Sequence, residues 1–317
     1  MHDYLDRVTG HQTAPGRADL GASGEGGNEM PAGGKPTVRS RRFGRKMQRH
    51  RVGAGFDQAQ AAQFIHGSRS KISRMEDGIT TARPAEVLLL LDRYGITDET
   101  ERDHLVWLAK NSGHRGWWLN FPELSDGYRD HISLEDDATF IRGWQTVLVP
   151  GLLQTAGYAE QTSMLAPNRV PPDVVAQFVK VREGRQAKIE EGGTSYAAII
   201  WEPIVTLPLV PEDVHREQLE HLLKVGKRSN VSIQVLPVSA GVKAGISYPF
   251  SSFSFESQPT VEAVAIDNLR GASILEGVDD LTAYASAFDQ LRSEALSPDA
   301  SARLIRRVLR SSKEEAS

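Results

Sequence analysis

Cysteine is absent from the 317 residues of the sequence. This absence excludes disulfide bonds and thiolate metal sites, and it fits a reducing cytoplasm. Apolar runs are also short, and none is long enough to span a bilayer. The amino terminus lacks the charged and apolar regions that mark a signal peptide. We therefore expect a cytoplasmic protein.

The sequence also lacks the motifs of several enzyme classes. It has no phosphate-binding glycine loop, no His-Glu-x-x-His metal pair and no nucleophile elbow. His215 and His221 are six residues apart. That spacing places them on different faces of a helix, so we expect surface residues rather than metal ligands. We expect no catalytic residue, no metal and no cofactor.

Apolar residues are sparse in residues 1–36, which contain eight of the 28 glycines. Such a segment buries too little surface to offset the entropy lost on ordering. We therefore expect a disordered tail, and Met30 is an alternative start site. The length predicts about two further domains, which we place at residues 37–112 and 115–311.

One segment of the chain is strongly basic. Residues 35–80 contain eleven lysines and arginines against three acids, a net charge of +8, whereas the whole chain carries −4 and the remainder therefore −12. A small basic region attached to an acidic body is typical of a protein that binds an anionic polymer such as nucleic acid.

The segment from Phe56 to Gly78 predicts a helix-turn-helix. Asp57 and Gln60 form a candidate capping box for a first short helix. His66-Gly67 interrupts the helical pattern, and its glycine suits the backbone angles of a tight turn. Ser68 is the expected cap of a second helix with a cationic polar face. The alternative is an ordinary helical hairpin with a solvated charged face.

These residues resemble the Cro/repressor-like (XRE) helix-turn-helix family. The resemblance is carried by Gln58, Ala62 and the run Ser68-x-Ser70-Lys71-Ile72-Ser73-Arg74-Met75-Glu76-x-Gly78. His66 stands where the family usually has glycine. Further helices are expected from Val38 to about Arg51, from Pro84 to Gly95, and from Asp98 to about Ser112. The resemblance implies a compact all-α repressor-like domain of five helices.

Sequence-specific, non-catalytic binding to double-stranded DNA is the function that this motif predicts. We expect Arg69 and Ser70 to contact base edges and Gln58 to bind a phosphate at a helix N-terminus. One such domain recognises a half-site, so we expect a homodimer associated with the nucleoid. The expected DNA-binding residues are Gln58, Ser68, Arg69, Ser70, Lys71, Ser73 and Arg74, with Arg39, Arg41, Arg42 and Arg45 as nonspecific phosphate contacts.

Residues 115–311 predict a larger α+β domain. Runs rich in β-branched and aromatic residues indicate strands. They lie at Tyr196–Trp201, Val231–Leu236, Ser251–Phe255 and Val261–Ile266. Helices are expected at Pro211–Lys227, at Asp279–Ala295 and from Pro298 to Arg310.

The motifs of this second part are similar, in order, to the C-terminal domain of WhiJ-like or Scr-type antitoxin-like bacterial regulators. They are Gly116-Trp117-Trp118, Val149–Thr155, Arg182-x-x-Arg185-Gln186, Glu217–Leu223 and Asn230–Pro237. The resemblance implies a transcriptional regulator, often encoded beside a small partner protein. A ligand or small protein partner is therefore expected to act on this domain.

Four residues of the second domain are weaker candidates for ligand or partner binding. Arg182 and Arg185 share a helix face and could clamp an anion, but we favour pairing with acids such as Glu202. Trp117 and Trp118 could form the floor of a pocket, although interdomain packing is the commoner use. Two other classes stay open: an antitoxin-like adaptor that autoregulates, and an enzyme with a DNA-targeting head.

Overall fold

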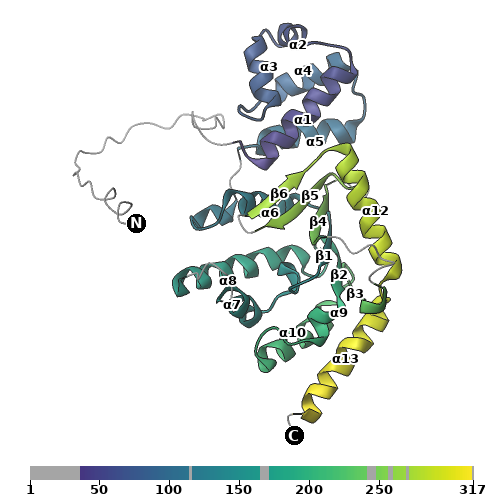
Figure 1. Cartoon of the computed structure of the whole chain (residues 1–317). Coiled ribbons are helices and arrows are strands. Elements are labelled where there is room, and N and C mark those ends of the chain that lie inside the picture. Colours follow the sequence, from purple (N-terminus) through teal and green to yellow (C-terminus); the bar gives the residue numbers. More distant parts are fainter. Residues whose placement is uncertain are drawn as a thin grey trace, which may run out of the picture.

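The computed structural model describes residues 36–113, 116–164, 171–240, 248–255, 260–268 and 271–315. The chain begins with a helical region and continues into a domain built on one sheet (Figure 1). Most of the expected tail, residues 1–35, lies outside the described residues. The first helices are α1 (Val38–Gly53), α2 (Gln58–Phe64), α3 (Arg69–Glu76), α4 (Pro84–Tyr94) and α5 (Glu99–Asn111).

Local capping explains where these helices begin and end. Asp57 accepts a hydrogen bond from the Gln60 backbone while the Gln60 side chain accepts from the Asp57 backbone, so the expected capping box is confirmed. Ser68 caps α3 through the Lys71 backbone N–H. Pro84 opens α4, and Gly95 ends it in the left-handed conformation at φ 76°.

The helical region has its own apolar core. Fully buried side chains from α1, α3, α4 and α5 meet there, and the alanines of α2 permit close approach of their backbones. The central members are Phe43, Met47, Ile72, Met75, Leu90, Leu91, Leu105 and Leu108. This core fixes the position of α3, which is only eight residues long and too short to be stable alone.

A six-stranded mixed sheet forms the centre of the second domain, with strand order β3-β2-β1-β4-β5-β6. Strands β1, β2 and β3 are parallel, whereas β4, β5 and β6 continue from β1 as an antiparallel meander. The strands are β1 (Phe140–Gln145), β2 (Ser195–Trp201), β3 (Val231–Leu236), β4 (Phe250–Ser254), β5 (Ala263–Asn268) and β6 (Gly271–Leu275).

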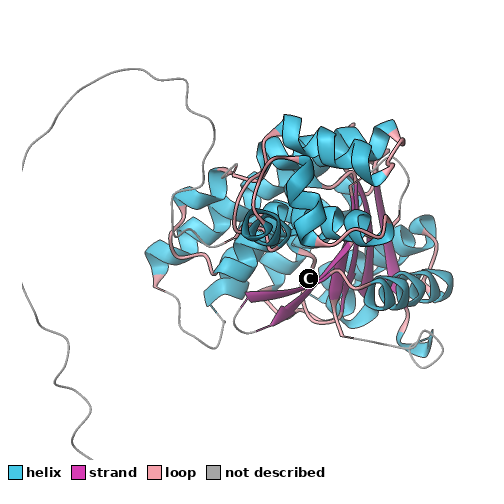
Figure 2. Ribbon diagram, turned by 90° about the horizontal axis from the view of Figure 1, so that it is seen from above, coloured by secondary structure: helices cyan, strands magenta, loops and turns pink. Residues whose placement is uncertain are grey.

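Helices cover both faces of this sheet (Figure 2). Side chains alternate between the faces with the period of two that strands impose: Ile141 and Phe253 contribute to one core, and Trp144 and Phe250 to the other. The helices are α6 (Asp126–Asp137), α7 (Ala156–Met164), α8 (Pro172–Gln186), α9 (Glu202–Thr206), α10 (Glu212–Val225), α12 (Val278–Glu294) and α13 (Pro298–Glu315). Within the described residues, no helix is long and apolar enough to cross a membrane.

The four expected strands are present, shifted at their ends by at most two residues. Within the described residues, strands β1 and β6 and helices α6 and α9 were not predicted. The expectation that His215 lies on the surface is wrong, because its side chain is buried and its Nε2 lies 3.1 Å from the Val205 carbonyl oxygen.

Candidate nucleic-acid interface

Helix α3 presents one polar face to solvent. Ser68, Arg69, Ser70 and Arg74 are exposed, and Ser73 is half-buried. The Lys71 ammonium lies 2.6 Å from a carboxylate oxygen of Glu86 on α4, so part of its charge is neutralised within the domain. The guanidinium groups of Arg69 and Arg74 are thus the main exposed charges of α3. A guanidinium can bind guanine through two hydrogen bonds or bind a phosphate.

The turn before α3 differs from the sequence expectation at one residue. His66, rather than Gly67, has a positive φ of 50°. The expectation that Gly67 supplies the unusual backbone angle is therefore wrong. A residue with a side chain is strained in the left-handed region. A glycine at position 66 would adopt the same backbone angle without this strain.

A buried ion pair holds α3 against α1. The Arg51 guanidinium donates to both carboxylate oxygens of Glu76, at 2.6 and 2.9 Å, and also to the Phe56 carbonyl oxygen. The Gln58 amide donates to the same carboxylate at 2.9 Å. Gln58, expected at a phosphate, thus has a partner inside the domain that orients the start of α2. Removing either member of such a pair would leave a buried charge uncompensated.

Glycines allow α1 and α3 to approach closely at their contact. A Cβ atom on Gly44 would lie 2.2 Å from the Glu76 carbonyl oxygen, and one on Gly78 would lie 2.7 Å from the Arg41 backbone nitrogen. Gly78 also has a positive φ of 71°. The C-terminal end of α3 is therefore fixed by direct backbone contact with α1.

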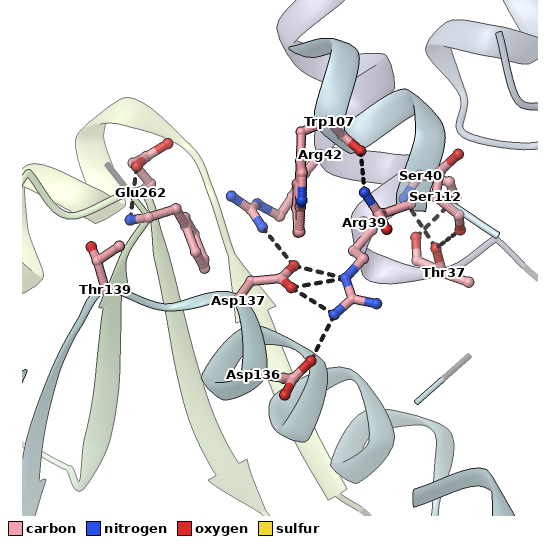
Figure 3. Close-up of polar contacts among 12 residues, drawn as sticks. Thr37, Arg39, Ser40, Arg42, Trp107, Ser112, Asp136, Asp137, Thr139 and Glu262 are labelled. Atoms are coloured by element: carbon pink, nitrogen blue, oxygen red, sulfur yellow. Dashed lines mark hydrogen bonds and ion pairs between the residues drawn. The ribbon is translucent and has the colours of Figure 1, made fainter. Parts of the chain in front are cut away.

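The arginines of α1 do not lie on the exposed face of the helix-turn-helix. Arg39 is 2% exposed and Arg42 is 4% exposed. The Arg39 guanidinium contacts Asp137 at 2.6 Å and Asp136 at 3.0 Å, both at the end of α6 (Figure 3). Arg42 pairs with Asp137 and stacks on the Phe255 ring, 3.3 Å from its centroid. The expectation that these two bind phosphates is wrong for this arrangement, because carboxylates of the second domain occupy them.

Arg41 and Arg45 also have carboxylate partners from the second domain. Arg41 lies 2.5 Å from Asp130 on α6, and Arg45 pairs with Glu276 after β6. Both side chains remain partly exposed, at 32% and 46%. The basic face of α1 is therefore an interdomain contact. Arg41 and Arg45, which were expected to bind phosphates, pair with carboxylates of the second domain.

The other candidates of the second domain have structural partners. Arg185 binds both carboxylate oxygens of Glu135 at 2.6 Å, so the favoured pairing is with Glu135 and not with Glu202. Arg182 donates to the side chain of Gln154. Trp118 is buried, while Trp117 packs over Gly184, where an added Cβ would lie 2.6 Å from the Trp117 ring. Nothing in these contacts forms an open ligand site.

The Arg185–Glu135 pair is part of a buried charged network with His131. The His131 Nε2 lies 3.1 Å from Glu135, and its Nδ1 lies 3.5 Å from Asp267. Burial alone would lower the pKa of His131, but the two carboxylates outweigh it and raise the pKa to about 10. Burial alone would raise the pKa of Glu135, but Arg185 and His131 lower it to about 2. The network therefore stays charged across a wide range of pH.

The comparisons with known proteins give two matches. Residues 42–105 match a helix-turn-helix domain, and residues 128–307 match a domain of unknown function, DUF5753. The fold and the exposed face of α3 define a helix-turn-helix protein, and this domain indicates a role in DNA-binding regulation. Because the second match covers more than half of the sequence, the chain belongs to the DUF5753 family. No curated protein and no solved structure matched the chain.

Proposed function

We propose that the protein is a sequence-specific, non-catalytic transcriptional regulator of the XRE type. The observation that carries this proposal is the exposed face of α3, with Arg69 and Ser70 in its first turn and Arg74 one turn later. In a helix-turn-helix, the first residues of the second helix reach base edges in the major groove. The buried Arg51–Glu76 pair supports the proposal, because it keeps this helix in one orientation.

The phosphate contacts are proposed to come from residues around α3 rather than from the interdomain face of α1. Arg74 is exposed on α3. Gln58 opens α2, and its side-chain amide has a second N–H besides the one that Glu76 accepts. Arg49 is exposed near the end of α1. These residues would position the protein on the duplex, while Arg69 would read sequence.

The larger domain is proposed to sense a ligand or a small protein partner and to join two chains as a homodimer. Two half-sites are needed for a tight complex, and recognition helices must lie about 34 Å apart to reach successive major grooves. Its contact with α1 supports this assignment, since a change in the second domain would reach the helix that supports α3.

Selection from a pool of random-sequence duplexes tests the proposal. The intact protein should enrich a sequence with two related half-sites, and analytical ultracentrifugation should show two chains on one selected duplex. Recovery of unrelated sequences with equal affinity would contradict sequence-specific binding. A single chain on each duplex would contradict the dimer.

A further inference from the structure

A cavity lies between the two domains and has no part in the proposed DNA contact. Its volume is about 480 Å³, within the range of small-molecule sites. One wall is the basic face of α1, and the other comes from α12 and from residues beside β5 and β6. In Figure 1, the start of α12 reaches the helical domain beside β5 and β6. A duplex is too large to enter such a space.

The α1 wall is strongly cationic. Arg42, Arg45, Lys46 and Arg49 line it, against the carboxylates of Glu262, Glu276 and Asp289. Arg49 is exposed and has no ion-pair partner within the part of the chain that the structure describes. Burial lowers the pKa of Arg45, and repulsion from Arg41, Arg42 and Arg49 lowers it further. An added anion would relieve this repulsion.

The opposite wall is largely apolar. Val278, Leu281 and Ala285 lie at intervals of three and four residues on α12 and therefore share one face of that helix. Val278 is 64% exposed. Thr282 and Ser286 also line this wall, and their small side chains leave it open.

We propose that this cavity binds an organic anion with an apolar body. The acidic head lies between Arg45, Lys46 and Arg49, and the body rests on Val278, Leu281 and Ala285. A carboxylate and a phosphate monoester share this chemistry, because either can accept charge-assisted hydrogen bonds from a guanidinium. An inorganic anion would leave the α12 wall uncovered, and a neutral molecule would leave Arg49, the lining cation without an ion-pair partner among the described residues, uncompensated.

The bound anion competes with two interdomain ion pairs. Arg45 pairs with Glu276, and the Lys46 ammonium lies 3.4 Å from Glu262. Occupation of the cavity weakens both pairs and shifts the position of α1, and with it α3, relative to the second domain. This regulatory consequence rests on the proposed function, but the binding itself does not.

Fluorescence of 8-anilinonaphthalene-1-sulfonate, an anion with an apolar body, tests the site in the intact protein without DNA. We expect octanoate and octyl phosphate to displace the probe, and the better competitor identifies the preferred head group. Inorganic phosphate and 1-octanol should each compete at least about tenfold more weakly. Equal competition by inorganic phosphate or by 1-octanol would overturn the proposed ligand class.

Two variants locate the site from opposite walls. Arg45→Gln combined with Lys46→Gln removes charge, and Ser286→Phe fills the cavity from an exposed position. Each should weaken the octanoate-displaceable binding by about tenfold or more, while Arg303→Gln, at an exposed arginine of α13 that does not line the cavity, should leave it unchanged. Wild-type affinity in both test variants would overturn the site. DNA affinity of the same proteins is measured separately, so a failure of DNA recognition is distinguishable from a failure here.

Discussion

At the scale of single residues, His66 is the clearest point of backbone strain. Its φ of 50° is one that side chains rarely adopt. His66→Gly removes a strain of about 1–2 kcal/mol, part of which is offset by the greater freedom of glycine in the unfolded chain. We expect urea denaturation to show a gain of up to about 1 kcal/mol.

Gly67→Ala is the matched control for that experiment. An added Cβ would meet only side-chain atoms of Lys71 and Ile65, at 3.3–3.4 Å. We expect stability within about 0.5 kcal/mol of the wild type. The reverse result, with His66→Gly neutral and Gly67→Ala strongly destabilising, would mean that the turn is built as the sequence alone suggested.

The buried His131 network makes stability depend on pH in a definite direction. The pKa of His131 is raised from 6.5 to about 10, so its contribution is complete below pH 6.5 and is lost as pH rises toward 10. The pKa of Glu135 is lowered from 4.5 to about 2, so its contribution is present above pH 4.5 and is lost as pH falls toward 2. Thermal unfolding across pH should therefore show a maximum between about 4.5 and 6.5.

His131→Gln tests the loss of stability that is expected between pH 6.5 and 10. The variant should be less stable than the wild type at pH 6, and the difference should shrink as pH rises toward 10. An unchanged slope between pH 6.5 and 10 would contradict a charged His131 between Glu135 and Asp267.

At the scale of elements, the contact between α1 and α3 decides the orientation of the recognition face. Gly44→Ala places a Cβ 2.2 Å from a backbone oxygen of α3, which cannot move without displacing the helix. We expect a loss of about 1–3 kcal/mol together with weaker DNA binding. Gly53→Ala, with open space around its Cβ at the end of α1, should be neutral or slightly stabilising.

Elements with strong local signals could be predicted from the sequence. The capping residues Asp57, Ser68 and Asp98 hold backbone N–H groups only three residues away, so their spacing alone indicates the helix starts. Strand β1 was missed because Gly143 and Arg142 interrupt its apolar alternation; its place in the sheet depends on pairing with β2 and β4. Such pairings are distant in sequence and leave no local pattern.

The partners of the α1 arginines could not be predicted for a different reason. A cluster of guanidinium groups attracts phosphate and carboxylate alike. The charge pattern of the sequence therefore does not show whether the partner of an arginine is a DNA phosphate or a carboxylate of the protein that is distant in sequence. Arg39 and Asp137 are 98 positions apart in the sequence. Only the fold places α6 against α1. The exposed face of α3 was easier to anticipate, because Ile72 and Met75 are three residues apart and share one helix side, which leaves Ser70, Ser73 and Arg74 toward the opposite side.

At the scale of the whole molecule, α1 belongs to both domains. Val38 lies in the core of the second domain, while Phe43 and Met47 lie in the core of the first. The Arg39 and Asp137 side chains are each 3% exposed. Asp137→Ala leaves a buried cation with its main partner removed, and we expect a loss on the order of 3 kcal/mol in thermal or urea unfolding.

Asp130→Ala is the matched control on the same helix. Its pair with Arg41 is partly exposed, at 25% and 32%, so we expect a loss of about 1 kcal/mol or less. Equal losses in the two variants would show that burial does not distinguish these pairs.

The central claim is that α3 reads DNA sequence, and an anisotropy titration tests it most directly. The intact wild type and its Arg69→Ala variant are titrated with the selected duplex and with a scrambled duplex, with Arg303→Ala as a control on exposed charge. We predict that Arg69→Ala weakens binding to the selected duplex by about 1–3 kcal/mol and leaves the scrambled duplex nearly unaffected. The control should match the wild type on both duplexes. An equal loss on both duplexes in the Arg69→Ala variant, or no loss on either, would contradict the claim.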